Sequence, residues 1–297
     1  MKNNRTGLQF ASLAVSRAPS RGRPRGFTLV EVAVSLVLLA LASGAVIAVL
    51  RQQIEQRRMA ETAAILNTAH DALLAYVTTY GYLPCPAIAA GNGVENAVVV
   101  GTTRTCPVET GFLPAKTLGM NNLDTSGLLE SAWHDGAGNS NGTYLRVIRY
   151  SVATLAGTPN AWAPVNPGLG AINSPAIRTA VQPYFSGTGT PLKNNHGLFV
   201  CYSSANLLAT NDRCGLSAAN DLAPNVAAII WSLGGDANDI ASYSTDERQN
   251  YTPTVPRVVI SHPYITKGAA GGPFDDQVSW ISYSALADRL VSGGWVQ

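Results

Sequence analysis

The first pattern in the chain is an apolar run over residues 27–50, FTLVEVAVSLVLLALASGAVIAVL, in which Glu31 is the one charged residue. As an α-helix, about 24 residues rising about 1.5 Å each match the roughly 30 Å of hydrocarbon in a bilayer. The run therefore predicts a transmembrane helix. A secretory signal with a shorter apolar core is the alternative, but a carboxylate inside an apolar span normally has a partner or a function.

After this run, apolar side chains recur at steps of three and four, which is the period of an amphipathic helix. The stripe consists of Ile65, Leu66, Ala69, His70, Leu73, Tyr76, Val77 and Tyr80. No proline occurs between Phe27 and Leu83, whereas Gly81 and Pro84 are stop signals. We therefore expect one helix that continues over residues 51–80 and lays its stripe against a globular head.

Residues 81–297 are predicted to form that head. The strand candidates are short and rich in β-branched and aromatic residues, and long runs of Gly, Pro and Asn between them predict surface loops. A short helix is expected near the C-terminus, at Ser284–Val291. The strand candidates are Tyr144–Val152, Gly197–Ser203, Val226–Leu233, Arg257–Ile265 and Gln277–Tyr283. The expected fold class is α+β, with the long N-terminal helix packed on an antiparallel β-sheet.

Charge is distributed unevenly along the chain. Six of the 20 Lys and Arg residues and none of the 18 acids precede Phe27. A basic N-terminal flank keeps residues 1–26 on the cytoplasmic side and exports the rest of the chain. Because the exported part has more acidic than basic side chains, we expect no binding to nucleic acid.

All four cysteines, Cys85, Cys106, Cys201 and Cys214, follow the apolar run. Their even number fits disulfides in an oxidising compartment, with zinc ligands or free thiols as the alternatives. Zinc is disfavoured because the chain has no CxxC pair and its histidines do not cluster with the cysteines. Pairing of sequence neighbours would join Cys85 to Cys106 and Cys201 to Cys214, which is one of three connectivities.

Candidate chemistry in the head is sparse. No GxSxG, HExxH, Walker A or GxGxxG pattern occurs, and the Trp-His-Asp sequence at 133–135 has no nucleophile at a suitable spacing. Acidic residues gather at Asp236 and Asp239 and again at Asp275 and Asp276. Loop carboxylates of this kind are candidate calcium ligands, although solvated turn residues and helix or strand caps are the preferred interpretation.

The segment around the start of the apolar run, RGFTLVE at 25–31, resembles the prepilin signature of type IV pilin-like proteins. The resemblance implies that a prepilin peptidase cuts between Gly26 and Phe27 on the cytoplasmic face and that the new amine of Phe27 is N-methylated. It also implies that Glu31 pairs with the N-terminal amine of a neighbouring subunit during assembly. Glycine suits the cut because it places no side chain beside the scissile carbonyl.

The resulting expectation is a non-catalytic structural subunit of a type IV filament system. A minor pilin is preferred because a bulky head crowds a repeating array; a type II secretion pseudopilin is the alternative. A membrane-anchored periplasmic enzyme or binding protein is the alternative of another class. The expected partners are the prepilin peptidase, other pilin or pseudopilin subunits and the inner membrane. The expected location is a single-pass inner-membrane protein with a periplasmic head, and later a pilus or pseudopilus. No cofactor is expected apart from calcium.

Overall fold

The computed structural model describes residues 26, 28–100, 103–133, 145–153, 198–205, 207, 214–215, 220–237, 244–252, 257–265 and 274–295. These residues form helices and a mixed β-sheet, so the fold class is α+β. The chain divides into two compact units, Met1–Gln53 and Ile54–Gln297. The sheet and every helix other than the first lie in the second unit, which is the head.

Helix α1, Leu29–Tyr80, is 52 residues long. Thr28 caps its start, because the Thr28 side-chain oxygen accepts a hydrogen bond of 3.2 Å from the backbone N–H of Glu31. The helix ends at Tyr80, where the stop signals predict its end. Gly81 then takes a φ of 75°, a left-handed conformation that favours glycine.

Within the head, the predicted stripe of α1 forms part of the main hydrophobic core. Leu66, Ala69, Leu73 and Val77 are all buried there. The end of the stripe differs, since Tyr80 is 43% exposed. The burial explains why a helix of this composition forms, because the apolar stripe leaves water only when the sheet covers it.

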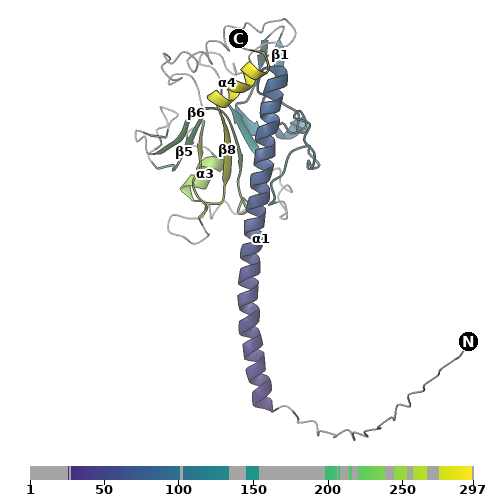
Figure 1. Ribbon diagram of the computed structural model, residues 1–297, viewed down its shortest axis with the longest axis vertical. Coiled ribbons are helices and arrows are strands. Elements are labelled where there is room, and N and C mark those ends of the chain that lie inside the picture. The colour runs from purple at the N-terminus through teal and green to yellow at the C-terminus, as the bar shows by residue number, and fades with distance from the viewer. Residues whose placement is uncertain are drawn as a thin grey trace, which may run out of the picture. The chain divides into compact units, whose positions relative to one another are not determined.

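The main sheet is built around one long central strand, with two shorter strands along one of its edges and one along the other. Figure 1 labels the central strand β6 and two of its neighbours, β5 and β8. Its strands are β3 (Thr110–Phe112), β4 (Arg149–Val152), β5 (Leu198–Cys201), β6 (Asp221–Ser232), β7 (Val258–Ile260) and β8 (Gln277–Ser282). β4 and β5 pair with one edge of β6, and β8 pairs with the opposite edge. β3 and β7 lie outside β4 and β5 respectively.

The expectation of an antiparallel sheet was wrong for one pair of strands, since β5 and β7 run parallel. The reason is the path of the chain between them. β6 reverses direction relative to β5, and the chain reverses again through helix α3 (Thr245–Tyr251) before it enters β7. Period-2 patterns predict a strand but contain no information about which strand becomes its neighbour.

Strands β4 and β5 together behave as one interrupted strand. Val152 lies opposite Ala228, and Ala153 donates its N–H to the carbonyl of Ala227 at 2.9 Å. The chain re-enters the sheet at Leu198, which lies opposite the next residue of β6, Val226. Residues 154–197 therefore separate two strand segments whose register on β6 is continuous at the junction and shifts further along β5.

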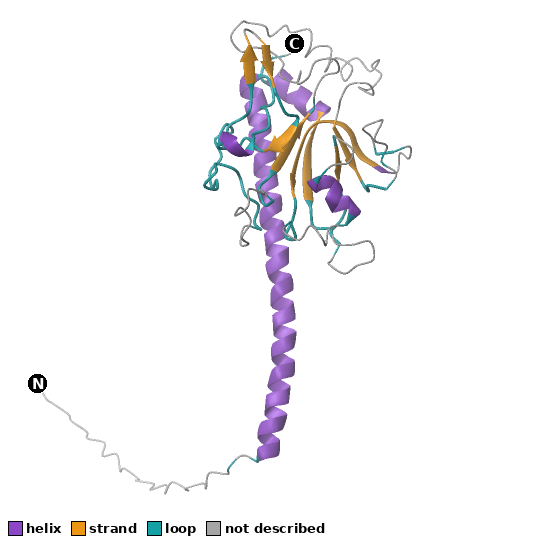
Figure 2. Ribbon diagram, turned by 180° about the vertical axis from the view of Figure 1, so that it is seen from behind, coloured by secondary structure: helices purple, strands orange, loops and turns teal. Residues whose placement is uncertain are grey.

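The remaining elements flank this sheet (Figure 2). Strands β1 (Val98–Val100) and β2 (Thr103–Thr105) form a separate hairpin that was not predicted, and the 3-10 helix η1 spans Ala89–Gly91. The C-terminal helix α4, Tyr283–Ser292, is the short helix predicted at Ser284–Val291. Each predicted strand segment contains a strand, but β6 begins five residues earlier than expected and β7 is only three residues long.

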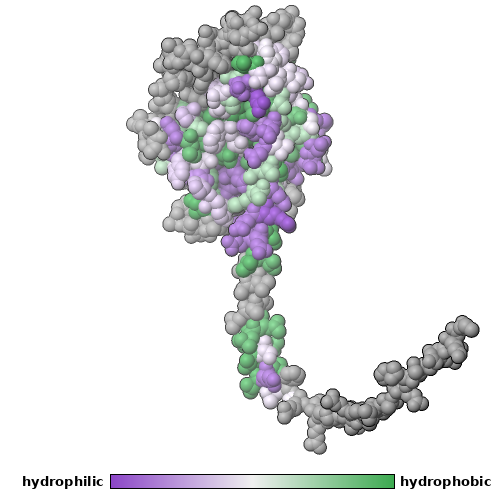
Figure 3. Space-filling view, viewed as in Figure 1, coloured by the Kyte–Doolittle hydropathy of each residue, from purple (hydrophilic) through white to green (hydrophobic). Residues whose placement is uncertain are grey.

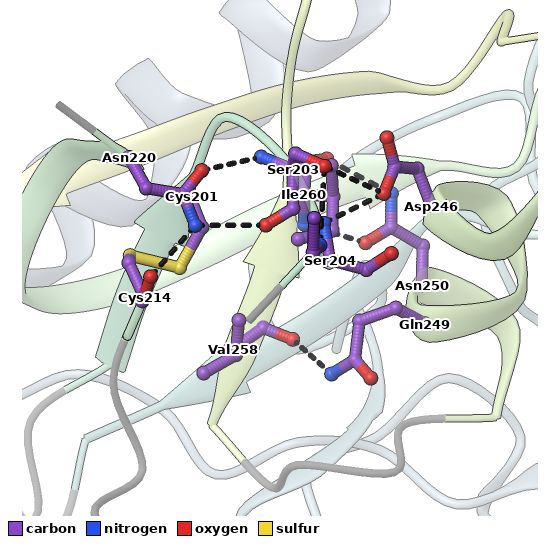
Figure 4. Close-up of a disulfide and its surroundings, with 11 residues drawn as sticks. Cys201, Ser203, Ser204, Cys214, Asn220, Asp246, Gln249, Asn250, Val258 and Ile260 are labelled. Carbon is purple, nitrogen blue, oxygen red and sulfur yellow. Dashed lines mark hydrogen bonds between the residues drawn. A yellow bond between two sulfur atoms is a disulfide. The ribbon is translucent and has the colours of Figure 1, made fainter. Parts of the chain in front are cut away.

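Two disulfides join sequence neighbours, Cys85 to Cys106 and Cys201 to Cys214, as the neighbour pairing predicts. The second disulfide belongs to a smaller apolar cluster with Phe199, Val258, Ile260 and Phe274. Alternate residues of β5 point to opposite faces of the sheet, so this cluster lies on the face away from the main core. In Figure 4, Val258 and Ile260 of β7 lie between this disulfide and the side chains of Gln249 and Asn250 from α3.

Candidate functional site

The first candidate site is the segment that carries the predicted cleavage position. Gly26 is exposed, and a Cβ added to it would meet no atom within 4 Å. Phe27, and with it the predicted cleavage and N-methylation, lies outside the described residues. Gly26 is therefore accessible, and the capped start of α1 lies two residues further along the chain, at Thr28.

Glu31 lies in the first turn of α1 and is exposed. Ser35 donates its hydroxyl to the backbone carbonyl oxygen of Glu31 at 2.7 Å. A carboxylate in the first turn is favoured by the partial positive charge of the helix N-terminus. The position of the Glu31 carboxylate is therefore favourable in the isolated subunit as well.

The side chains around Glu31 are apolar and exposed. Leu29, Val30 and Val32 are 87%, 70% and 46% exposed, and apolar side chains colour this part of α1 green in Figure 3. Within the described residues, no helix reaches the length and apolarity needed to cross a bilayer.

The second candidate site is a cluster of three carboxylates in the head. Asp236 follows β6, Glu247 lies in the first turn of α3, and Asp275 precedes β8. Each of the three offers an oxygen atom, and these oxygens lie within 4.8 Å of one another. The fold thus brings together two of the four aspartates that the sequence suggested as calcium ligands, and adds a glutamate.

The other two suggested aspartates have different outcomes. Asp276 is buried, and its carboxylate accepts a hydrogen bond of 2.7 Å from the side-chain amide of Asn250. Asp239 lies outside the described residues. Asp276 is therefore tied to α3 by a structural contact, whereas Asp236 and Asp275 share the cluster.

Short hydrogen bonds hold the cluster in place. Asp275 accepts a bond of 2.7 Å from the backbone N–H of Gly235, and its own N–H donates to Glu247 at 3.3 Å. Glu247 also closes the capping box of α3, because it accepts from the N–H of Ser244 at 2.9 Å. At Gly234, φ is 71° and a Cβ would come within 1.7 Å of Asp275, so only glycine permits this approach.

Burial and mutual repulsion raise the pKa values of these acids. Burial, followed by the charge of Asp236, raises the pKa of Asp275 to about 7. Burial also raises the pKa of Glu247 to about 7, against the lowering effect of the Ser244 hydrogen bond. Burial raises the pKa of Asp276 well above its ordinary value. The cluster therefore favours a shared proton or a bound cation over three bare charges.

Sequence reasoning did not name Glu247 as a ligand, although a local signal for its position exists. The residues Ser-Thr-Asp-Glu at 244–247 have the S-x-x-E spacing of a capping box, which predicts a helix start with the glutamate at its third position. The same spacing occurs at Thr28 and Glu31. Pattern alone would have found α3, but not its proximity to Asp236 and Asp275.

One histidine in the head has an aspartate partner. His262 lies 3.3 Å from Asp246 and stacks on Phe274 with ring centroids 3.6 Å apart. Asp246 in turn accepts bonds from Ser203 and Ser204, so the serine hydroxyl is directed at the carboxylate. This order differs from a nucleophilic triad, in which the imidazole contacts the hydroxyl. The Trp-His-Asp sequence continues at 134–135 outside the described residues.

Comparison with known proteins identifies the N-terminal segment. Residues 21–47 match the family model described as the prokaryotic N-terminal methylation motif. The chain thus carries the signature of type IV pilin-like prepilins, whose family is structural and not catalytic. No curated protein and no solved structure matches the chain.

Proposed function

We propose that the protein is a non-catalytic structural subunit of a type IV filament system, a minor pilin that is cut after Gly26 and assembled through α1. The observation that carries this proposal is the methylation motif at residues 21–47, located directly at the start of a 52-residue helix. Two disulfides in the head are consistent with an oxidising compartment outside the cytoplasm.

In this proposal the leader, residues 1–26, stays in the cytoplasm, and residues 27–50 hold the precursor in the inner membrane. The prepilin peptidase, other pilin or pseudopilin subunits and the membrane itself are then the partners. Basic residues crowd the leader, which supports this orientation. A type II secretion pseudopilin carries the same motif and is the alternative within the class; a membrane-anchored enzyme or binding protein is the alternative outside it.

Glu31 provides the chemistry of assembly in this proposal. Its carboxylate is surrounded by exposed apolar side chains that would pack against other helices in a filament. In such a low-dielectric setting, the cationic amine of a neighbouring Phe27 would attract the carboxylate strongly. Removal of one partner from a buried ion pair costs roughly 3 to 5 kcal/mol, enough to exclude a subunit from a filament.

The test is a comparison of Glu31→Ala with Glu61→Ala, a second carboxylate on α1 whose side chain is 58% exposed and which pairs only loosely with Arg57, at 3.9 Å. Both variants are expected to be processed, but only Glu31→Ala should be depleted from sheared filaments or pseudopili. Equal recovery of wild type and Glu31→Ala in the assembled fraction would remove the proposed role.

A second proposal concerns the head. We infer that Asp236, Glu247 and Asp275 hold a divalent cation, with calcium as the natural occupant, because Ca²⁺ prefers several carboxylate and carbonyl oxygens. Isothermal titration of the chelator-treated protein with CaCl₂ tests it, with Asp275→Asn as the comparison. Identical titrations for the two proteins would refute a site at this cluster.

A further inference from the structure

The free edges of the main sheet are covered in different ways. At β7, the side-chain amide of Gln249 donates to the carbonyl of Val258 at 3.0 Å (Figure 4). The Asn250 amide donates to the carbonyl of Ile260 at 2.9 Å and accepts from its N–H at 2.7 Å. These two side chains of α3 take the place of a neighbouring strand and block pairing at this edge.

The edge of β3 is covered by backbone. Ala87 and Phe112 exchange two backbone hydrogen bonds, of 2.8 and 2.9 Å. By contrast, β8 pairs with β6 alone among the strands of the described residues. The sheet is therefore closed along β3 and β7, while the outer edge of β8 has no strand beside it in the part of the chain that the structure describes.

A cavity of about 350 Å³ lies along this edge. Gln277, Val278 and Ser279 of β8 form one wall, and α1 forms another with Ala63 and Asn67 among its lining residues. The segment after β7 forms a third wall with Ser261, His262 and Tyr264. Side chains of successive strand residues point to opposite faces, so a cavity lined by three in a row faces the edge of the strand. The cavity is a groove beside the backbone of β8.

One end of the groove is acidic. Asp275 and Asp276 line it, and Asp236 and Glu247 each offer an oxygen atom within 4.8 Å of one on Asp275. Among the described residues that line the groove there is no Lys or Arg, and His262 there lies 3.3 Å from Asp246. The groove therefore combines a strand edge without a neighbouring strand with a group of carboxylates that favours a cationic partner.

We propose that the outer edge of β8 is a docking site for an extended, positively charged segment of a partner protein, which adds to the sheet as a further strand. Main-chain hydrogen bonds to β8 would provide affinity, and a Lys or Arg side chain at the acidic end would provide selectivity. This inference is independent of how the N-terminus is processed, because every residue it uses belongs to the head.

Fluorescence anisotropy with the full-length protein in detergent micelles tests the proposal. The probe is a labelled peptide of about eight residues that alternates Lys and Val, a typical strand length. A Glu-for-Lys peptide tests the charge. Two further peptides keep the same side chains but carry N-methyl groups on alternate residues, which blocks the backbone N–H groups along one edge of the strand in the first peptide and along the other edge in the second. They test main-chain pairing. We expect the Lys peptide to bind about tenfold more tightly than the Glu peptide and than one of the two N-methylated peptides.

Two exposed alanines of α1 provide a matched pair of variants. Ala63 lines the groove and Ala60 does not. Ala63→Phe is expected to fill the groove and weaken binding about tenfold, with Ala60→Phe close to wild type and both variants melting like the parent. Because neither alanine is buried, loss of folding is not expected to obscure the result.

Other outcomes would overturn the proposal. If both N-methylated peptides bound as tightly as the unmethylated Lys peptide, the site would be a charged patch that does not add a strand. Binding that is unaffected by Ala63→Phe would place the peptide elsewhere. Self-association of the protein that Ala63→Phe abolishes would identify a second copy as the occupant, and CaCl₂ binding without any peptide binding would leave a cation site only.

Discussion

The interrupted strand predicts that the segment 154–197 can be removed without loss of the sheet. Ala153 and Leu198 lie opposite consecutive residues of β6, Ala227 and Val226, so their Cα atoms should be about one strand residue, roughly 3.4 Å, apart along the strand. A direct peptide bond between Ala153 and Leu198 would convert β4 and β5 into one continuous strand. A second variant with two glycines at the junction allows for local irregularity.

The expected gain in stability follows from loop closure. Fixing the two ends of an inserted segment of about 44 residues costs roughly (3/2)RT ln n in chain entropy, or about 3 kcal/mol, which the deletion would recover. Guanidinium unfolding monitored by tryptophan fluorescence measures the difference. The denaturant slope should also decrease, because a shorter chain exposes less surface on unfolding.

Preserved disulfides are the structural control for this deletion. Both bonds lie outside the deleted segment, so mass spectrometry of the unreduced variant should still find Cys85 joined to Cys106 and Cys201 joined to Cys214. An insoluble product, scrambled disulfides, or a stability more than about 1 kcal/mol below that of the parent would refute the continuous-strand interpretation.

Three further predictions concern the head. Asn250→Ala leaves the N–H and C=O of Ile260 without their amide partner and should cost about 2 to 4 kcal/mol in urea unfolding; a loss under 1 kcal/mol would contradict the edge-blocking role. In the presence of a chelator, Tm should fall as pH rises from 5 to 8, because the pKa values of Glu247 and Asp275 are raised to about 7 in the folded state. The stability that these two protonated acids contribute is therefore fully present below their unfolded-state pKa values and is lost as the pH rises through 7. Asp275→Asn should flatten this dependence, and a parent Tm independent of pH would refute it. Gly234→Ala should cost about 1 to 3 kcal/mol by thermal melting, since its φ is 71° and its Cβ would meet Asp275; an unchanged Tm would contradict the close packing.

Several parts of the fold could be predicted because they depend on local signals. The end of α1 follows from Gly81, which takes the positive φ that the stop requires. The disulfides join neighbours along the chain, 21 and 13 residues apart, so short loops bring the cysteines together. The last helix follows a serine cap, Ser282, which accepts a hydrogen bond from the N–H of Ala285.

The acidic cluster and the parallel strand pair could not be predicted because they depend on long-range closure. Asp275 meets the backbone of Gly235 across 40 residues of sequence, and only the positions of β6 and β8 in the sheet bring them together. The parallel pairing of β5 with β7 depends on the path of the chain through β6 and α3, which lie between them in the sequence. Neither relation leaves a periodic pattern in the sequence.

The strand interruption shows a further limit. The sequence pattern predicted separate strands at Tyr144–Val152 and Gly197–Ser203, and both contain strands. Their continuity became visible only through their common partner β6, because residues 154–197 separate them in the sequence.

The central claim is that a prepilin peptidase cuts the chain between Gly26 and Phe27. N-terminal sequencing and intact mass of the protein, produced in hosts with and without the peptidase, test it most directly. We expect a chain that starts at Phe27 with a methylated amine only when the peptidase is present. A chain that retains residues 1–26 in both hosts, or that is cut within residues 40–44, would contradict it.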